Sequence, residues 1–354
     1  MPTTASLSQL TTLRLGGPAA RIVTPTDEEA LLEAVGAADA DGEPLLVLAG
    51  GSNVVVADAG FPGTVVRVAT RGVASSQMSD GRLALDVAAG ENWDTLVAAC
   101  VEQGLSGIEA LSGIPGSVGA TPIQNVGAYG QEIADVLTGV VALDRLTGDV
   151  HELDNEACLF DYRSSVFKRD PGRWLVLRVR LALERTSDSE PVRYAELARR
   201  LRIGEGERAP LAEVREAVLA LRRGKGMVLD ADDPDSFSAG SFFTNPILRT
   251  RDFDAFAERA AERLGAGVRP PSWPVAERLV KTSAAWLIER AGFTRGHGNP
   301  DGIAISSKHT LALTNRGAGT TTELVALARE IAGGVHEAFG VQLAPEPVFI
   351  GYDW

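Results

Sequence analysis

The segment from Gly113 to Gly130 constrains the fold of this chain more than any other part of the sequence. It holds five glycines and two prolines in eighteen residues, and it carries no charged side chain. Glycine reaches positive φ values and lets backbone N–H groups approach a ligand, while proline fixes the neighbouring turns. Because uncharged loops of this kind bind phosphates through oriented amides, the segment predicts a backbone that contacts a nucleotide.

A second glycine-rich loop, Gly50 to Asn53, follows the apolar run Leu45–Ala49 and leads directly into Val54–Val56. With the strand-like Arg21–Val23 and the helical pattern of Asp27–Val35, this part predicts a β-α-β arrangement. A GxGxxG fingerprint would open a helix instead of a strand, which disfavours the Rossmann fold. Each glycine loop alone is more often a simple turn, but together the two could converge on one diphosphate-bearing cofactor.

The rest of the chain alternates strand-like and helix-like segments without an internal repeat. Apolar patterning predicts three strands: Arg82–Val87, Leu137–Leu143 and Trp174–Leu181. It predicts helices at Trp93–Gln103, Leu211–Arg223, Ala284–Gly292 and, with the Thr320 region supplying the N-cap, Thr320–Ile331. The polar stretch from Asp230 to Ser238 is interpreted as a surface connection.

Length and composition indicate a soluble globular protein of two or three domains. The chain has 354 residues, 45% of them hydrophobic and 23% charged. No apolar run reaches the roughly 18 residues needed to span a bilayer, and the first ten residues lack a secretory signal pattern, so we expect a cytoplasmic protein and no membrane partner. A net charge of −13 argues against nucleic-acid binding but leaves an anionic small molecule as a ligand.

Cysteine and histidine usage limits the metal and cofactor chemistry. Cys100 and Cys158 form neither a disulfide framework nor a metal pattern, and we expect both to be core residues. The only histidines are His151, His297, His309 and His336. No histidine precedes residue 151, so neither glycine loop holds one that could form a histidyl flavin bond, no metal site is expected, and a flavin would be bound non-covalently.

Three further residues are candidates for catalysis. Arg163 lies among aromatic residues, Ser241 lies in a turn of small residues, and Glu346 lies between two prolines. Taken alone, Arg163 is more often a surface ion pair and Ser241 an N-cap. Without a neighbouring histidine, Ser241 is a poor nucleophile, but it can donate a proton where its alkoxide is stabilised.

These motifs, taken in order, resemble the bacterial UDP-N-acetylenolpyruvoylglucosamine reductases of peptidoglycan precursor synthesis. The matching segments are Leu13–Gly17, Leu48–Val54, Gly113–Gly130, Tyr162–Phe167, Ser238–Pro246, Ser307–Leu311, Glu346 and Gly351. The resemblance implies an α+β fold: a two-lobed FAD-binding domain of the vanillyl-alcohol-oxidase (PCMH-like, type 2) kind and a C-terminal α+β substrate-binding domain. It implies a first lobe at 1–70 closed by 344–354, a second lobe at 71–228 and a substrate domain at 229–343.

The resemblance also implies the reaction. NADPH reduces the FAD and leaves, and the enolpyruvyl group of UDP-N-acetylglucosamine enolpyruvate then accepts a hydride at its methylene carbon to give UDP-N-acetylmuramate. Arg163 and Glu346 would stabilise the enolate-like transition state, and Ser241 would protonate the carbon alpha to the carboxylate. Tyr194 resembles the tyrosine that stacks on the uridine in the longer, type I form.

Further residues acquire roles from the same resemblance. The implied FAD contacts are Gly50, Gly51, Ser52, Asn53, Gly113, Ile114, Pro115, Gly116, Ser117, Gly119, Ala120, Asn125, Gly127, Ala128 and Tyr129. The implied substrate contacts are Tyr194, Lys225, Asn245 and Tyr129. Two features depart from the family pattern. The connection from Gly226 to Ser238, between Lys225 and Ser241, is longer than in shorter members of the family. Val348 stands where some relatives carry a basic residue.

Two other functions remain open from the sequence. A flavin-dependent alcohol or hydroxy-acid oxidase on the same cofactor fold would react rapidly with oxygen and would not need Ser241. A flavin- or nucleotide-binding regulator would keep the loops without the chemistry. For the reductase we expect a small-molecule substrate, no nucleic-acid or membrane partner, and a monomer or weak oligomer.

Overall fold

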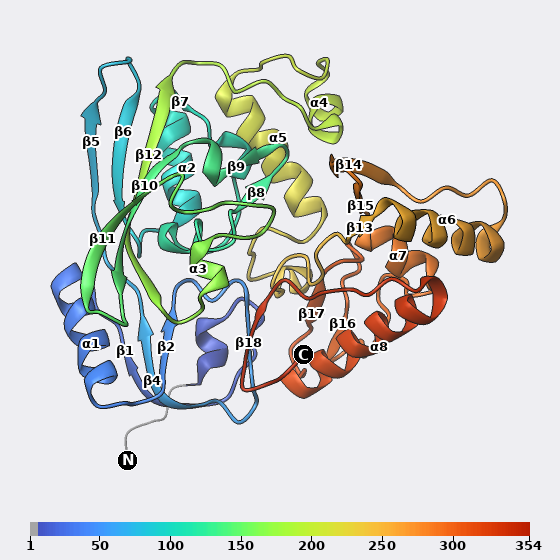
Figure 1. The fold of residues 1–354 in the computed structure, drawn as a ribbon, viewed down its shortest axis with the longest axis horizontal. Coiled ribbons are helices and arrows are strands. Elements are labelled where there is room, and N and C mark those ends of the chain that lie inside the picture. The colour runs from blue at the N-terminus through green and yellow to red at the C-terminus, as the bar shows by residue number, and fades with distance from the viewer. Residues whose placement is uncertain (1–5) are drawn as a thin grey trace. The chain divides into compact units, whose positions relative to one another are not determined.

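The computed structural model describes residues 6–354, and the first five residues of the predicted lobe 1–70 lie outside the described residues. The chain divides into two compact units, each built from segments that are not contiguous in sequence (Figure 1). The first unit contains residues 19–51 and 61–224, and the second contains 6–18, 52–60 and 225–354. Both units combine helices and strands. The functional division into two lobes and a substrate domain stays a prediction.

A small parallel sheet begins the first unit. Its strands are β1 (Ala19–Val23), β4 (Phe61–Arg67) and β2 (Leu45–Leu48), in the order β1-β4-β2. Helix α1 (Glu28–Ala40) connects β1 to β2, which confirms the predicted β-α-β arrangement. The side chain of Asp27 accepts a hydrogen bond from the Ala30 N–H and caps this helix, whose buried side chains recur at helical spacing.

An antiparallel sheet forms the larger part of the first unit. Its main strands follow the order β11-β10-β12-β6-β5, and a short strand pairs with β12 beside this path. The strands are β5 (Val73–Gln77), β6 (Leu83–Ala88), β7 (Leu105–Ser106), β10 (Leu137–Asp144), β11 (Asp149–Asp154) and β12 (Trp174–Arg185). Helix α2 (Trp93–Glu102) buries one face in the hydrophobic core that these strands share. The three strands predicted from apolar patterning are confirmed.

Short elements carry the glycine loop and the segment that contains Tyr194. They are η2 (Glu109–Leu111), η3 (Val118–Ala120), β8 (Gly127–Ala128), β9 (Gln131–Glu132), η4 (Ile133–Asp135), α3 (Val166–Arg169), α4 (Ala195–Leu201) and α5 (Leu211–Gly224). Helices α4 and α5 pack around a separate small core that includes Leu197, Val214 and Val218. Tyr129 packs against this core, so the end of the glycine loop is fixed by helix packing.

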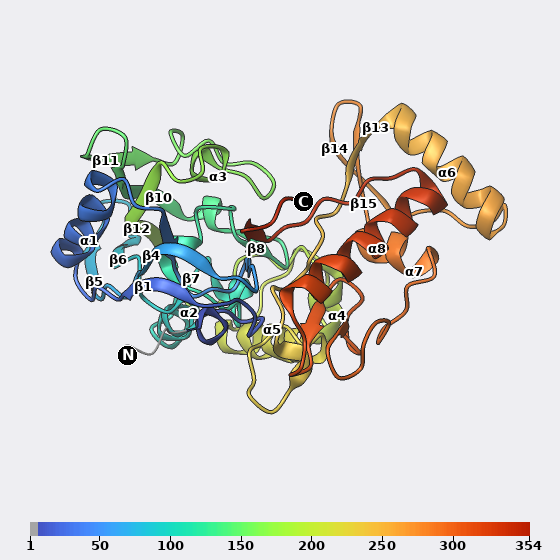
Figure 2. The ribbon, with the colours of Figure 1, turned by 90° about the horizontal axis from the view of Figure 1, so that it is seen from below.

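The second unit has its own core and three small sheets. Its elements are η1 (Leu7–Leu10), β3 (Val54–Val56), η5 (Pro234–Ser236), β13 (Ile247–Arg249), α6 (Thr250–Leu264), β14 (Ser272–Ala276), β15 (Leu279–Thr282), α7 (Ala284–Arg290), β16 (Ile303–Ile305), β17 (Leu313–Asn315), α8 (Thr321–Phe339) and β18 (Val348–Ile350). The sheets are β13-β15-β14, β16-β17 and the parallel pair β18-β3. Helix α8 contacts both α6 and α7, and Figure 2 shows α7 beside it. Thr320 forms a capping box with Glu323, which confirms the predicted N-cap.

The prediction that Asp230–Ser238 is a surface connection is wrong for its second half. Asp235, Ser236, Phe237 and Ser238 are all buried, with relative exposures of 4–7%. The segment is polar because its side chains and carbonyls are hydrogen-bonded to other parts of the same unit, and a satisfied polar group can be buried at little cost.

Two further expectations concern the cysteines and the membrane. Cys100 and Cys158 are buried, as predicted, and burial raises the pKa of both thiols to about 12. Within residues 6–354, no helix is long and apolar enough to cross a bilayer.

Candidate active site

The two glycine loops meet in the first unit. A Cβ atom added to Gly50 would lie 2.6 Å from the Cα of Gly116, so the two backbones touch at a distance that only glycine allows. Gly51, Gly113 and Gly116 all have positive φ values, of 63°, 72° and 125°. The loops that were predicted to converge on one cofactor are therefore in direct contact on the Gly50 side.

The start of the long loop is fixed by a charged pair. Asp94, in the first turn of α2, accepts a hydrogen bond of 2.6 Å from the Gly113 N–H and forms two hydrogen bonds with Arg215. Burial raises the pKa of Asp94, but the hydrogen bonds from Arg215 and Gly113 outweigh it, and the net shift is downward. The carboxylate is therefore ionised at neutral pH.

Ser117 is the feature of this loop that best fits a diphosphate. Its Oγ is buried and has no hydrogen-bond partner among the described residues. An unpaired buried hydroxyl costs about 1–3 kcal/mol, and native proteins rarely keep one without a reason. A phosphate oxygen at this point would satisfy the hydroxyl, so the loop chemistry fits the diphosphate of FAD.

The later part of the loop forms a tight hairpin from β8 and β9. Asn125 donates to Glu132 Oε2 at 2.8 Å and accepts from the Ala134 N–H, so its side chain holds the hairpin together. Tyr129 has a φ of 50° and packs edge-on against Tyr194, with ring centroids 5.3 Å apart. Burial raises the pKa of the Tyr129 phenol to about 12, so this ring stays neutral.

Arg163 lies against the same hairpin. Its guanidinium donates to the carbonyl oxygens of Gly127 at 2.8 Å and Asn125 at 3.3 Å. Its φ of 51° is unusual for a residue with a side chain, and such strain tends to persist where the surroundings hold a functional residue in place. Of the seven non-glycine residues with positive φ in the described chain, three were predicted site residues: Asn125, Tyr129 and Arg163.

In the second unit, Ser241 and Glu346 lie on neighbouring segments. The Glu346 N–H donates to the carbonyl of Phe242, the residue after Ser241, at 2.9 Å, and the Phe242 N–H donates to Leu311 at 2.7 Å. The alternative interpretation of Ser241 as an N-cap is wrong, because the segment continues irregularly to β13 and the next helix begins only at Thr250. Both side chains are half-buried.

Asn53 belongs to the second unit as well, because the division between the units falls after Gly51. Its carbonyl accepts from the Val348 N–H, and its side chain donates to the Glu346 carbonyl at 3.5 Å. The parallel pairing of β3 with β18 therefore places the end of the first glycine turn beside Glu346.

Two predicted substrate residues, Asn245 and Lys225, belong to the second unit. The side-chain amide oxygen of Asn245 accepts a hydrogen bond of 3.0 Å from the Ala284 N–H at the start of α7, so this oxygen already has a structural role. Lys225 follows the last residue of α5, and the next residue, Gly226, has a φ of 66°. Val348 is exposed, without the charge that some relatives were expected to carry there.

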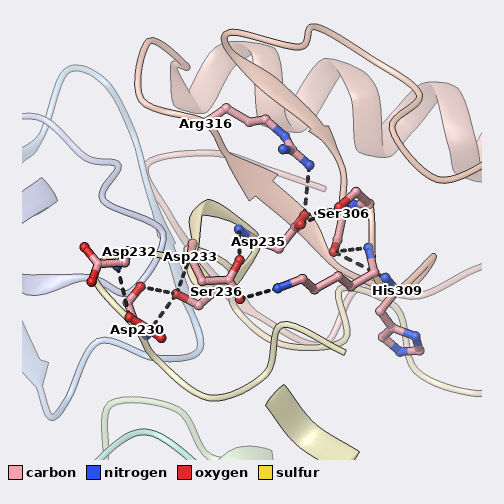
Figure 3. A network of polar contacts seen from close by, with 10 residues as sticks. Asp230, Asp232, Asp233, Asp235, Ser236, Ser306, His309 and Arg316 are labelled. Atoms are coloured by element: carbon pink, nitrogen blue, oxygen red, sulfur yellow. Dashed lines mark hydrogen bonds and ion pairs between the residues drawn. The ribbon is translucent and has the colours of Figure 1, made fainter. Parts of the chain in front are cut away.

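Sequence reasoning missed the polar cluster around Asp235 (Figure 3). The carboxylate of Asp235 binds Ser307 and Arg316, and Lys308 forms an ion pair with Asp233 at 2.7 Å. These partners are 72 to 81 residues apart in sequence, so no local pattern indicates the cluster. Asp94 and Arg215, 121 residues apart, were missed for the same reason.

Comparisons with known proteins define the class of this protein. Residues 19–154 match the family model described as an FAD binding domain, and residues 233–350 match the model of the C-terminal domain of UDP-N-acetylenolpyruvoylglucosamine reductase. The chain is therefore a flavoprotein with FAD as its cofactor, on the two-part α+β fold expected from the sequence.

Full-length relatives identify the family. The chain is 57% identical to the UDP-N-acetylenolpyruvoylglucosamine reductase of Streptomyces coelicolor over 98% of its own length and 89% of the relative's. It is 54% identical to that of Thermobifida fusca, covering 98% and 96% of the two chains. The crystal structure of the Thermus caldophilus enzyme matches with a TM-score of 0.65 at 26% identity, covering 98% of this chain and 97% of the other. This chain belongs to the family of UDP-N-acetylenolpyruvoylglucosamine reductases, FAD-dependent oxidoreductases.

Proposed function

We propose that this chain uses NADPH to reduce the enolpyruvyl group of UDP-N-acetylglucosamine enolpyruvate, giving UDP-N-acetylmuramate for peptidoglycan synthesis. Family membership supports the reaction. The observation that carries the residue roles is the hydrogen bond between the Glu346 N–H and the carbonyl of Phe242, because it holds a carboxyl group and the Ser241 hydroxyl on adjacent segments. A proton donor and a stabilising carboxyl group are what addition across an activated double bond requires.

FAD is held without a covalent bond by the two glycine loops. The proposed contacts are Gly50, Gly51, Ser52, Asn53, Gly113, Ile114, Pro115, Gly116, Ser117, Gly119, Ala120, Asn125, Gly127, Ala128 and Tyr129. Backbone N–H groups and the Ser117 hydroxyl bind the diphosphate, where oriented dipoles replace the water lost on burial. When bound, FAD supplies from its N5 atom the hydride that it has received from NADPH.

Ser241 protonates the carbon alpha to the substrate carboxylate. The hydride arrives at the methylene carbon, and the electron pair of the double bond then forms the new C–H bond with the proton from Ser241 Oγ. A serine hydroxyl is a weak acid, so its alkoxide is short-lived and is reprotonated through water. The backbone hydrogen bonds of Phe242 with Leu311 and Glu346 hold the chain next to Ser241, which limits the positions open to the hydroxyl and lowers the entropic cost of the proton transfer.

Arg163 and Glu346 stabilise the negative charge that develops on the substrate. The guanidinium of Arg163 binds the carboxylate of the enolpyruvyl group, and its carbonyl contacts with Gly127 and Asn125 fix its plane. Glu346 donates a hydrogen bond to the developing enolate as a protonated carboxyl group or through a water molecule. Groups fixed in advance in this way stabilise the transition state without reorganisation.

The remaining roles concern recognition of the nucleotide sugar. Tyr194 stacks on the uridine, Tyr129 contacts the sugar beside the flavin, and Lys225 and Asn245 bind the diphosphate. The edge-on contact between the two tyrosine rings supports a shared task. The enzyme acts as a monomer or weak oligomer in the cytoplasm, with lobes at 1–70 and 71–228 and the substrate domain at 229–343.

The test separates the two half-reactions of the FAD-loaded enzyme under anaerobic conditions. In Ser241→Ala, bleaching of the flavin by NADPH should proceed at the normal rate. Return of the flavin colour on adding the enolpyruvyl substrate should slow by on the order of 100-fold or more, since general acid catalysis contributes that much. Ser272→Ala, which changes an exposed serine of the same unit, is the matched control and should leave both rates unchanged.

Other outcomes would contradict the proposal. Equal slowing of both half-reactions would mean that Ser241 has a structural role or binds the nicotinamide. NADPH consumption with oxygen at full speed, without the enolpyruvyl substrate, would favour the oxidase alternative.

A further inference from the structure

Asp235, labelled in Figure 3, is a buried carboxylate that precedes Ser241 by six residues in the sequence. Its side chain is 5% exposed. Oδ1 accepts hydrogen bonds of 2.8 Å from the Ser307 N–H and from Arg316, and Oδ2 accepts one from the Ser307 hydroxyl at 2.5 Å. All these donors belong to one stretch of chain, so Asp235 connects residues 307–316 to the segment before Ser241.

The same stretch also holds the chain on both sides of Ser241. The Asn315 N–H donates to the carbonyl of Phe237 at 3.0 Å, and the Phe242 N–H donates to Leu311 at 2.7 Å. Between these points Thr12 Oγ1 donates to the Ser238 carbonyl at 2.6 Å. The path from Asp235 to Phe242 therefore has little freedom to shift, and Asp235 holds its N-terminal end through an ionic contact.

Asp235 also supports the turn that follows Lys225. A Cβ atom added to Gly226 would lie 2.8 Å from the carbonyl oxygen of Asp235 and 3.0 Å from its Cβ. The backbone next to the proposed diphosphate-binding Lys225 therefore packs directly on Asp235. One buried residue thus contacts the turn after a proposed substrate-binding lysine and anchors the loop of the proposed proton donor.

We propose that Asp235, paired with Arg316, is a positioning residue of the reaction, which holds the Ser241 hydroxyl over the face of the alpha carbon that it protonates. This inference rests on the proposed role of Ser241. Asp235 acts through the backbone and touches neither the substrate nor the flavin in this scheme. Its charge matters because an ionised carboxylate can accept all three hydrogen bonds from Ser307 and Arg316 at once, whereas an amide cannot.

The titration behaviour agrees with this role. Burial raises the pKa of Asp235, but the hydrogen bonds from Ser307 and Ser306 and the charge of Arg316 outweigh it, and the net shift is downward. Asp233 and Lys308 form an ion pair with each other, and Asp230 and Asp232 are further aspartates of the network in Figure 3. Asp235 is therefore ionised throughout the neutral pH range.

Protonation of the alpha carbon creates a stereocentre, and this provides a specific readout. The hydride and the proton add to the two carbons of the double bond, and the face that receives the proton sets the configuration of the lactyl group. If the Ser241 hydroxyl moves, water protonates the enolate instead, more slowly and from both faces. A displacement of about 1 Å can cost on the order of 100-fold in rate.

The test uses Asp235→Asn in the FAD-loaded enzyme. Flavin reduction by NADPH should stay normal, while the second half-reaction slows by on the order of 100-fold and the product contains both configurations at the alpha carbon. Asp232→Asn changes an exposed aspartate three residues away and should behave as the wild type in every measurement. Ser307→Ala keeps the ion pair but removes the Oδ2 donor, and it should give a smaller effect in the same direction.

The outcomes separate this inference from the proposed function. A normal second half-reaction and a single product configuration in Asp235→Asn, with Ser241→Ala slow, would overturn the inference alone. A fast Ser241→Ala would overturn the proposed function and the inference with it. If Asp235→Asn does not fold, Ser307→Ala and Arg316→Lys decide: mixed configuration supports the role, and unchanged stereochemistry refutes it.

Discussion

The hydroxyl of Ser117 is buried within a loop whose flanking backbone is hydrogen-bonded. The Gly116 carbonyl accepts from the Trp93 N–H, and the Val118 N–H donates to Glu91, so the residues on either side are held in place. The Ser117 hydroxyl itself has no hydrogen-bond partner among the described residues. Under the proposed function, a phosphate oxygen of FAD is the partner of this hydroxyl.

At this scale we predict that Ser117→Ala weakens FAD binding by roughly 10- to 100-fold, because a hydrogen bond to a charged group is worth about 1.5–3 kcal/mol. The apoprotein should be as stable as the wild type or more stable, since the change removes an unsatisfied polar atom. Flavin titration of the apoprotein and its thermal unfolding would measure the two effects.

Ser106→Ala is the matched control. Ser106 Oγ is also buried without a partner among residues 6–354, but it lies in β7 and belongs to neither glycine loop. It should change apoprotein stability in the same direction and leave FAD affinity unaltered. Equal loss of affinity in both variants would show that Ser117 does not contact the cofactor.

The catalytic candidates Ser241 and Glu346 can be recognised from the sequence, whereas the proposed positioning residue Asp235 cannot. Ser241 and Glu346 stand in motifs of glycine, phenylalanine and proline that the family resemblance singles out. Asp235 stands in an aspartate-rich stretch typical of a surface loop, and only its partners at 307 and 316 show that it is buried. Local composition cannot indicate burial that depends on a distant donor.

At the scale of elements, the N-terminus of helix α8 is capped by its own residue Thr320 and also by Asp58, a residue from a distant part of the sequence. Asp58, in the loop after β3, accepts hydrogen bonds from the N–H groups of Thr321 and Thr322 and from the Thr322 hydroxyl. A carboxylate at a helix N-terminus also interacts favourably with the helix dipole. The β3 loop and the longest helix of the unit are thereby joined.

We predict that Asp58→Asn lowers the free energy of unfolding by about 0.5–1 kcal/mol at pH 7, because the amide lacks the second acceptor oxygen and the charge that interacts with the helix dipole. Partial burial raises the pKa of Asp58. The hydrogen bonds from Thr322 and Thr321 lower this pKa by more than burial raises it, so the net shift is downward. The stabilisation is therefore complete above the ordinary aspartate pKa and is lost as the pH falls through the lowered value.

Chemical denaturation of both proteins over a range of pH would check this expectation. The difference should be constant near neutrality and should vanish in acid, where Asp58 is protonated. Asp254→Asn, an exposed aspartate of α6, should show almost no difference at any pH. A difference for Asp58→Asn that persists unchanged in acid would rule out the charged cap.

At the scale of the whole molecule, neither unit is a continuous piece of chain. The core of the second unit contains Leu13, Leu15 and Val55 together with residues from the last third of the sequence. Strand β18 pairs with β3, almost 300 residues earlier. The region that matches the C-terminal family model is therefore incomplete as a folding unit.

We predict that residues 225–354 expressed alone do not fold cooperatively, because the fragment exposes the apolar surface that Leu13, Leu15 and Val55 cover and leaves β18 without its partner. Thermal unfolding by circular dichroism and limited proteolysis would test this. The same fragment with residues 52–60 joined through a flexible linker should regain part of its order. A sharp unfolding transition of the unextended fragment would contradict the expectation.

The sequence by itself determined the elements whose causes are local. The Asp27 and Thr320 caps, the alternating strand at Leu83–Ala88 and the glycine loops all follow from preferences of a few neighbouring residues. The family motifs added the cofactor and the candidate catalytic residues.

Only the tertiary structure decided which of these pieces meet. The contact of Gly50 with Gly116, the link between Glu346 and Asn53, 293 residues apart, and the ion pair of Asp235 with Arg316 have no local signal. The physical reason is that such contacts depend on the closure of long loops and on how a whole core packs, which short stretches of chain do not encode.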